Sequence, residues 1–145
     1  KILLEPGRYM VGNAGVLLSR VEHLKRGAGK NFLIVDAAMN DLVRPAMYEA
    51  FHQIVQVRFN DAAQVTYDVV GPVCESGDWL GRDRSLAVRS GDLLAILSTG
   101  AYCMAMASNY NTRGRAAEVL VDGDKVHIIR ERETAQDQMR AERLV

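Results

Sequence analysis

Short apolar stretches separated by turn-forming residues run along most of this chain, and they predict mainly β structure. Residues 16–24 and 32–36 are two such stretches, and the flexible polar segment 27–30 between them predicts two strands joined by a loop. Strands dominate the expected fold from residue 55 onward. The same pattern predicts them at residues 65–70, 86–88, 92–97 and 116–121.

The clearest local signal is the turn Asp122-Gly123-Asp124. It separates the run 116–121 from a second one at 125–130, and an Asp-Gly pair in that setting is a strong hairpin signal. We therefore expect these two runs to pair as antiparallel strands. The first residues, Ile2-Leu3-Leu4, resemble the end of a strand. Because the chain has no initiator Met, we expect it to be part of a longer protein.

Helical spacing is confined to two segments. After Pro45, apolar residues recur at intervals of three and four, which predicts a short helix within residues 46–57. Residues 130–145 are rich in Arg, Glu, Gln and Ala, which predicts a polar terminal helix. No internal repeat or linker interrupts the chain, so the expected architecture is one mainly β domain with short helices.

The composition is that of one globular domain: 145 residues, of which 48% are hydrophobic and 25% charged. The 18 basic and 18 acidic residues cancel, so nothing indicates a nucleic-acid partner, which normally leaves a basic surface. No apolar run approaches the roughly 18 residues of a membrane span, and the start is too short for a signal peptide. We expect a cytoplasmic protein with neither a nucleic-acid nor a membrane partner.

Cysteine and histidine usage predicts no metal site. Cys74 and Cys103 are too few for a disulfide framework and lack the spacing of metal ligands. His23, His52 and His127 lie in or near apolar runs without Cys or carboxylate partners. We therefore expect reduced thiols, a core position for Cys103 and structural roles for the three histidines.

Four short polar clusters lie at the ends of apolar runs, where a scaffold of strands can present side chains to a shared ligand. Each joins a turn former to an Arg, Glu, Cys or Tyr. Together they supply guanidinium, carboxylate, thiol and phenol groups, a set suited to a zwitterionic substrate with carboxylate or phosphate groups. The clusters are Glu5-Pro6-Gly7-Arg8, Arg44-Pro45-Ala46-Met47-Tyr48, Cys74-Glu75-Ser76-Gly77-Asp78 and Gly100-Ala101-Tyr102.

The first two clusters are suited to binding anions. Pro6 fixes the backbone and Gly7 allows the main chain to approach a ligand, so backbone N–H groups and Arg8 could hold an oxyanion. Arg44 and Tyr48 are four residues apart and share one face of a helix, where a guanidinium and a phenol form a carboxylate clamp. The alternatives are a simple turn with a surface ion pair, and a solvated Arg with Tyr packed on its stem.

The last two clusters supply a proton donor and an aromatic ring. The carboxylate of Glu75 beside the thiol of Cys74 favours a retained proton, and hence work as a general acid. Gly100 and Ala101 leave room for a ligand before Tyr102, whose phenol can stack or donate. The alternatives are a small buried cysteine in a turn and ordinary core packing of the tyrosine.

In order and spacing, these motifs resemble the C-terminal portion of the diaminopimelate decarboxylase family, which uses pyridoxal 5′-phosphate (PLP) in lysine biosynthesis. The resemblance covers nearly the whole chain. It implies that residues 1–145 form the C-terminal β-barrel or sandwich-like domain of a fold-type III PLP decarboxylase, with the connection from a preceding α/β barrel at its start. Besides the four clusters, the matching segments are 36–41, 71–73, 105–111 and 115–121.

The resemblance also implies a role for each candidate residue. Cys74 is expected to donate a proton to the carbon that loses CO₂. Arg44 and Tyr48 are expected at the distal carboxylate of meso-diaminopimelate, and Glu75 at its distal ammonium. In this family the segment matching Cys74 and Glu75 reaches the partner subunit's site, which implies a homodimer with composite active sites. The expected cofactor contacts are Glu5, Pro6, Gly7, Arg8 and Tyr102, of which Arg8 and Tyr102 also contact substrate.

The PLP-binding α/β barrel, with its Schiff-base lysine and the histidine that stacks on the cofactor, is expected to precede residue 1. Lys1, Lys25, Lys30 and Lys125 match no such motif, so we expect this chain alone to be inactive. Two alternatives stay open. One is an ornithine- or arginine-type decarboxylase, against which the cationic clamp argues because a basic distal group needs an acidic pocket. The other is a non-catalytic β module for ligand binding or assembly.

Overall fold

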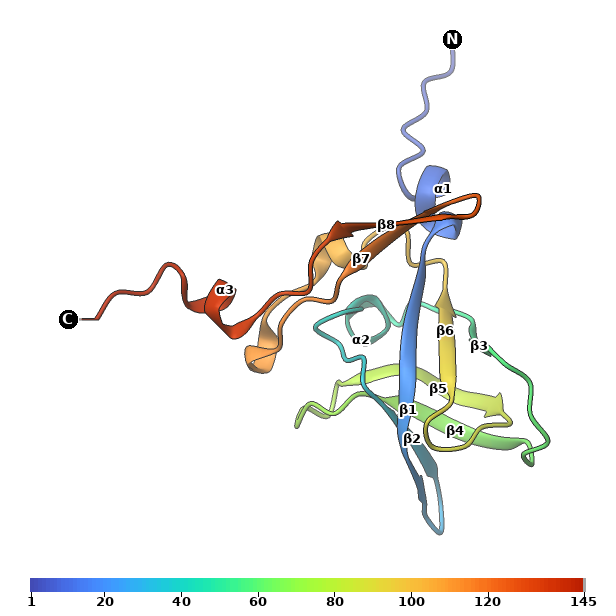
Figure 1. The fold of residues 1–145 in the computed structure, drawn as a ribbon. Coiled ribbons are helices and arrows are strands. Elements are labelled where there is room, and N and C mark those ends of the chain that lie inside the picture. The colour runs from blue at the N-terminus through green and yellow to red at the C-terminus, as the bar shows by residue number, and fades with distance from the viewer. Residues whose placement is uncertain (145) are drawn as a thin grey trace.

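A six-stranded sheet is the largest feature of the computed structural model, which describes residues 1–144 (Figure 1). Its strands are β1 (Val16–Arg26), β2 (Asn31–Val35), β3 (Ile54–Gln56), β4 (Val65–Val70), β5 (Trp79–Leu86) and β6 (Leu93–Leu97). Neighbouring strands follow the order β3-β6-β1-β2-β4-β5. All neighbours are antiparallel except β2 and β4, which are parallel.

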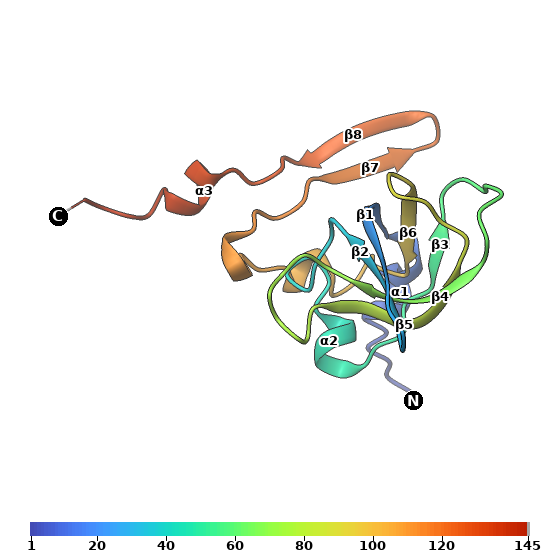
Figure 2. The same cartoon turned by 90° about the horizontal axis from the view of Figure 1, so that it is seen from below.

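The other elements are short. Strands β7 (Glu118–Asp122) and β8 (Lys125–Arg130) form a separate hairpin, which lies outside the six-stranded sheet in both views (Figures 1 and 2). The helices are α1 (Arg8–Val11), α2 (Arg44–Tyr48) and α3 (Ala135–Met139), with 3₁₀ turns η1 (Gly12–Ala14), η2 (Met104–Met106) and η3 (Tyr110–Thr112). No helix within residues 1–144 is both long and apolar enough to cross a bilayer.

The core lies inside the curled sheet. Side chains alternate between the two faces of a strand, so Leu94 and Ile96 of β6 point inward and are only 1% exposed. Ile54 of β3 and Leu80 of β5 belong to the same buried cluster. A Cβ added to Gly81 of β5 would lie 3.0 Å from Cδ1 of Ile54. The two edge strands therefore approach each other, and the sheet forms a nearly closed barrel.

Most predicted strands are confirmed to within a few residues. Those expected at 16–24, 32–36, 65–70 and 92–97 correspond to β1, β2, β4 and β6, and the hairpin around Asp122-Gly123-Asp124 is present as β7 and β8. The fold is mainly β with short helices, as the pattern of apolar runs predicts.

The strand predicted at residues 86–88 is wrong in position. The strand observed there is β5, which begins at Trp79 and ends at Leu86. Its centre, Arg82-Asp83-Arg84, is polar because β5 is an edge strand of the sheet and these side chains are exposed or half-buried. Asp83 also has a positive φ of 54°, which interrupts regular pairing with β4. A search for apolar runs therefore overlooks this strand.

The helix predicted within residues 46–57 is also wrong in extent. Helix α2 spans only Arg44–Tyr48, and Glu49 ends it in the left-handed conformation with φ 53°. Ile54–Gln56 is strand β3, paired with β6. The β-branched Ile54 and Val55 suit a strand, and pairing with a distant segment overrides the local helical spacing.

Both ends of the chain differ from the predictions. Ile2, Leu3 and Leu4 form no strand and are at least 80% exposed, because no described strand pairs with them. Within residues 130–144 the only helix is α3, which covers five residues. Thr134 and Asp137 form a capping box at its start, and this local signal sets where the helix begins.

Two glycines allow the loop after β6 to meet the segment between α1 and β1. Thr99 N donates to Gly15 O and Gly100 N donates to Gly12 O, each at 3.0 Å. A Cβ on Gly15 would lie 2.3 Å from Gly100 Cα, and a Cβ on Gly100 would lie 2.0 Å from Val11 O. Neither position has room for any side chain.

We predict that Gly100→Ala lowers the free energy of unfolding by at least about 2 kcal/mol, because the new methyl group overlaps backbone that cannot move aside. Gly29→Ala is the matched control: a Cβ there meets nothing within 4 Å, so its effect should stay within about 0.5 kcal/mol. Urea unfolding midpoints measure both. Equal midpoints for the two variants would show that the Gly15–Gly100 contact does not constrain the fold.

Candidate active site

The guanidinium of Arg44 lies close to two tyrosine rings. Its Cζ is 5.4 Å from the ring centre of Tyr48, one turn along α2, and 5.3 Å from that of Tyr102, in the loop after β6. Pro45 is buried at the start of α2 and fixes where Arg44 leaves the barrel. The Arg44 Nε–H is buried and has no hydrogen-bond partner within the described chain. This guanidinium therefore retains donor capacity for a ligand.

The turn before α1 lies beside the same tyrosine. Gly7 has a positive φ of 42°, and a Cβ on it would lie 3.7 Å from the Tyr102 hydroxyl. Arg8 follows and lines a hollow of about 430 Å³ together with Phe51 and Ser98. We call Gly7, Arg8, Arg44, Tyr48 and Tyr102 the Arg44 cluster. Glu5 and Pro6 are exposed and extend from it toward the N-terminus.

A buried histidine lies behind the Arg44 cluster. His52 is 1% exposed, and its Nδ1–H donates to the carbonyl oxygen of Leu97 at 2.9 Å. Burial lowers the pKa of His52 below its usual range, and the positive charges of Arg44, Arg8 and Arg84 lower it further. His52 is therefore neutral at pH 7, and three guanidiniums make this side of the protein attractive to anions.

Cys74 and Glu75 lie in the loop between β4 and β5, which a buried carboxylate organises. Asp78, 3% exposed, accepts hydrogen bonds from Met39 N and Val73 N, both at 2.7 Å. Burial raises the pKa of this carboxyl above its usual range, despite those two bonds. We call residues 71–78 the Cys74 loop. Its thiol is exposed, which excludes the alternative of a small buried cysteine.

Two residues from η3 contact the Cys74 loop. The Tyr110 hydroxyl donates to Glu75 Oε2 at 3.4 Å, and Asn111 Nδ2 lies 3.6 Å from Cys74 Sγ. The other carboxylate oxygen of Glu75 accepts from Gly77 N at 3.1 Å. The negative charge of Glu75 raises the pKa of the Tyr110 phenol above its usual range, so this tyrosine keeps its proton.

The predicted site residues thus form two groups. Gly7, Arg8, Arg44, Tyr48 and Tyr102 lie together, while the Cys74 loop lies with η3. Within residues 1–144, no hydrogen bond, ion pair or ring contact joins the two groups.

The sequence predicts a structural role for His52 and assigns no individual role to Tyr110 and Asn111. The signal for the last two was present, because Ser108-Asn109-Tyr110-Asn111 sets an aromatic residue among turn formers. Their partners are at least 35 residues away in the chain, so spacing alone could not indicate the contact. Cys103, by contrast, packs against the core as predicted, and burial raises the pKa of its thiol to about 12.

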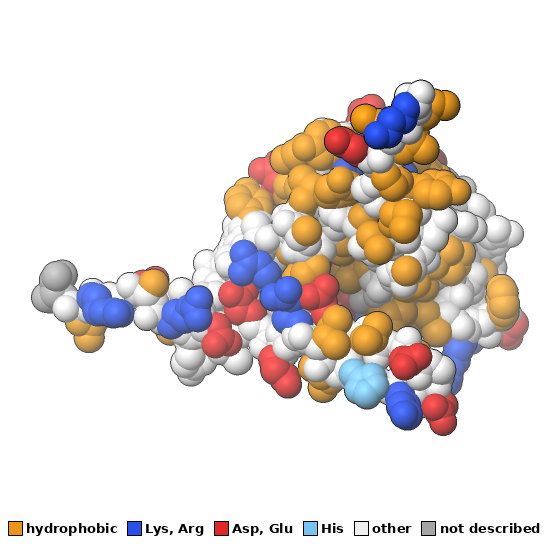
Figure 3. All heavy atoms as spheres, turned by 90° about the horizontal axis from the view of Figure 1, so that it is seen from above, with side chains coloured by type: hydrophobic (Ala, Val, Ile, Leu, Met, Phe, Trp, Pro, Cys, Tyr) orange, Lys and Arg blue, Asp and Glu red, His pale blue; other side chains and the backbone are white. Residues whose placement is uncertain are grey.

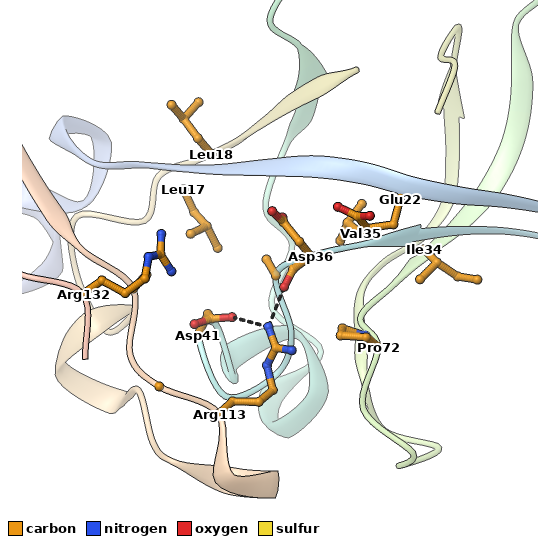
Figure 4. A pocket seen from close by; sticks show the side chains of 13 residues that line it. Leu17, Leu18, Glu22, Ile34, Val35, Asp36, Asp41, Pro72, Arg113 and Arg132 are labelled. Atoms are coloured by element: carbon orange, nitrogen blue, oxygen red, sulfur yellow. Dashed lines mark hydrogen bonds and ion pairs between the residues drawn. The ribbon is translucent and has the colours of Figure 1, made fainter. Parts of the chain in front are cut away.

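A further hollow, of about 370 Å³, contains none of the predicted site residues (Figure 4). Arg113 points into it, donating to Asp36 O at 2.6 Å and forming an ion pair with Asp41 at 3.9 Å. Another bond runs from Arg113 Nε to Asn40 Oδ1 at 2.9 Å. These bonds attach the segment after η3 to residues 36–41. No group of three or more metal-ligating side chains is present within residues 1–144.

Comparison with known proteins identifies the domain. Residues 8–100 match the family model of the C-terminal sheet domain of pyridoxal-dependent decarboxylases. The chain is 60% identical over 139 residues to diaminopimelate decarboxylase of Neisseria meningitidis serogroup B, and 59% identical over 144 residues to that of Pseudomonas aeruginosa. These alignments cover 96% and 99% of this chain but only 34% and 35% of the relatives. The chain therefore spans about a third of their length.

Solved structures agree with this assignment. Diaminopimelate decarboxylase from M. jannaschii, in complex with L-lysine, superposes with a TM-score of 0.92 at 44% identity, over 96% of this chain and 32% of that one. The Helicobacter pylori enzyme in complex with L-lysine superposes with a TM-score of 0.87 at 42% sequence identity. The match covers 94% of this chain and 34% of that one. A viral arginine decarboxylase superposes with a TM-score of 0.65 at 18% sequence identity, over 72% of this chain and 30% of that one. At that identity the likeness is one of fold alone.

We predict that His52 makes stability fall as the pH drops below 6.5. Its pKa is lowered in the folded state, so the unfolded chain binds the proton more readily, and stability present above pH 6.5 is lost as the pH falls toward the folded pKa. Melting temperatures of the parent protein and of His52→Gln, measured from pH 7.5 to 5.0, should converge as the pH decreases. A difference in melting temperature between parent and His52→Gln that stays constant with pH would contradict a lowered pKa of His52 in the folded state.

Proposed function

This chain belongs to the pyridoxal-dependent decarboxylases, as their C-terminal sheet domain, and on that premise we propose that it recognises substrate in a diaminopimelate decarboxylase. The reaction converts meso-2,6-diaminopimelate to L-lysine and CO₂, the last step of lysine biosynthesis. The Arg44 cluster carries the proposal, because its guanidinium lies close to two phenols on a positively charged side of the domain. Such a site suits a carboxylate, the group that distinguishes the distal end of this substrate from ornithine and arginine.

The turn before α1 fits the phosphate of PLP. Gly7 has no side chain and leaves the main chain open beside the Tyr102 hydroxyl, with the Arg8 guanidinium next to it. Backbone N–H groups and a guanidinium are the donors that phosphate prefers. When bound, PLP supplies the electron sink for the bond that breaks. We assign five residues as contacts of this cofactor: Glu5, Pro6, Gly7, Arg8 and Tyr102.

The distal end of the substrate is bound by charge pairing. Arg8, Arg44 and Tyr48 hold the distal carboxylate, and Glu75 holds the distal ammonium. The Arg44 Nε–H already lacks a hydrogen-bond partner within the described residues. A substrate without the distal carboxylate would leave further N–H groups of this guanidinium without an acceptor. Leaving a buried charged donor unpaired is costly, so the site rejects such substrates.

Cys74 supplies the proton. As the bond to the carboxylate breaks, CO₂ departs and the carbon that held it takes up a proton from the exposed thiol of Cys74. A thiol is a competent general acid at this step. We place Cys74 and Glu75 in the site of a second subunit, a placement supported by the lack of any hydrogen bond, ion pair or ring contact between them and the Arg44 cluster within residues 1–144. The assembly is a homodimer with composite sites, located in the cytoplasm.

The surface around the N-terminal segment supports an assembly larger than this domain. Exposed apolar side chains gather there, as the view onto that face shows (Figure 3). They include Ile2, Leu3, Leu4, Tyr9 and Met10, each at least 69% exposed. Large exposed apolar patches mark interaction surfaces. This face, next to the Arg44 cluster, suits the α/β barrel that provides the remainder of the PLP site.

Two other functions are separable by experiment. An ornithine- or arginine-type decarboxylase would release CO₂ fastest from those amino acids, whereas a binding or assembly module would release none. The assay uses the full-length protein, in which the barrel accompanies this chain, with PLP and each of the three amino acids. Release of CO₂ from meso-diaminopimelate above the other two is the expected result.

We predict that Arg44→Ala raises the KM for meso-diaminopimelate by about 10- to 100-fold, because it removes charge-assisted bonds to the distal carboxylate. The matched control is Arg82→Ala, which removes an arginine stacked 4.0 Å from the Trp79 ring, outside the cluster. Its KM should equal that of the parent. An unchanged KM for Arg44→Ala would rule out the carboxylate clamp.

We predict that Cys74→Ala lowers kcat by about 100-fold or more while leaving the absorbance of bound PLP unchanged. Mixing it with Arg44→Ala tests the composite site. A mixed dimer has one site with both native groups, so random exchange of subunits should restore about a quarter of parental activity at low substrate. If the two groups instead act within one chain, mixing restores nothing.

A further inference from the structure

Residues of η3 and its flanks form a tight turn against the Cys74 loop. Asn111 has φ 59° and ψ 29°, and Thr112 follows with φ 56°. Two successive non-glycine residues in the left-handed region are unfavourable, and more so for β-branched Thr112. Such a conformation persists only where the surrounding contacts fix it.

The contacts that fix the turn lie on both sides of the strained residues. Before them, Ser108 N donates to Asn40 O at 2.9 Å. After them, Arg113 is held by Asn40 Oδ1 and Asp36 O. Asn109 Nδ2 also donates across the turn to Arg113 O at 3.0 Å. The turn is therefore attached at each end to residues 36–41.

The Cys74 loop is attached to the same segment. Met39 N donates to Asp78 Oδ1 at 2.7 Å, one residue before Asn40. Residues 36–41 thus serve as a common platform that fixes the distance between the two loops. On that platform, Tyr110 Oη reaches Glu75 and Asn111 Nδ2 reaches Cys74.

We propose that Tyr110 and Asn111 are positioning residues for the reaction, Asn111 orienting the Cys74 thiol and Tyr110 holding the Glu75 carboxylate. The inference rests on the proposed function and extends it to two side chains that act through Cys74 and Glu75. The Asn111 amide N–H stabilises the thiolate that remains once Cys74 has given up its proton. The Tyr110 hydroxyl, donating to one oxygen of Glu75, fixes the carboxylate in the orientation that meets the distal ammonium.

Each assignment affects a different kinetic constant. Asn111→Gly removes the amide while keeping the positive φ available, and should lower kcat about tenfold with little change in KM. Tyr110→Phe removes only the hydroxyl and should raise KM for meso-diaminopimelate about tenfold with little change in kcat. Thr112→Gly is the matched control, because it relieves strain in the same turn without touching Cys74 or Glu75. Both of its constants should equal those of the parent.

A second measurement does not depend on turnover. In the full-length protein, iodoacetamide alkylation of Cys74 at pH 7.5, followed by peptide mass spectrometry, reports the thiolate at that position. The rate should fall about threefold to tenfold in Asn111→Gly, because the thiolate loses a donor, and stay at the parental value in Thr112→Gly. Cys103 is an internal reference of low reactivity, since burial raises its pKa to about 12.

The outcomes test the proposed function separately from the positioning roles of Tyr110 and Asn111. If the parent releases no CO₂ from meso-diaminopimelate, the proposed function fails, whatever the alkylation rates are. If the parent is active and Asn111→Gly alkylates and turns over like the parent, the positioning role of Asn111 is refuted while the proposed function stands. If Tyr110→Phe keeps the parental KM, the role of Tyr110 is refuted in the same way.

Discussion

The buried carboxylate of Asp78 is the interaction on which the Cys74 loop depends. A carboxylate taken out of water is costly unless it is hydrogen-bonded, and here Met39 N and Val73 N each donate to one of its oxygens. Gly71 makes this possible, because a Cβ there would lie 2.4 Å from Asp78 Oδ2. The loop is therefore pulled inward at Asp78, while the side chains of residues 74–76 project outward. Cys74 and Glu75 are exposed for that reason.

The Arg44 cluster depends on a different constraint, the absence of side chains where two backbones meet. Gly15 and Gly100 approach closely enough to exclude any Cβ, and this contact fixes the loop after β6 against the segment that follows α1. Tyr102, at the end of that loop, has a positive φ of 58°. Its ring is thereby brought over the Arg44 guanidinium and its hydroxyl beside Gly7. The barrel contributes the end of β6, from which the loop with Tyr102 starts.

What the sequence could predict follows the range of the interactions involved. Strands such as β1 and β6 alternate inward and outward residues, a local pattern, and they were predicted. The local apolar spacing predicts helix where strand β3 forms, because the pairing of β3 with β6 joins segments far apart in the chain. The candidate residues were each ambiguous and gained meaning from their order along the chain. The contacts of Tyr110 and Asn111 with the Cys74 loop were not predicted, because they depend on how both loops attach to residues 36–41.

The separation of the Arg44 cluster from the Cys74 loop has an electrostatic consequence. The Arg44 cluster is cationic through Arg8 and Arg44, whereas Glu75 is anionic. Burial, together with these two guanidiniums and that of Arg84, keeps His52 neutral. If Glu75 lay beside Arg44 in the same subunit, the two would form an ion pair and satisfy each other without a ligand. In the proposed dimer they face each other across the substrate instead. A molecule that carries both a distal carboxylate and a distal ammonium satisfies both at once, whereas one that carries only the ammonium leaves the guanidinium unpaired. Under the proposed function, selectivity for diaminopimelate would follow from holding opposite charges on loops that make no hydrogen bond or ion pair with each other within residues 1–144.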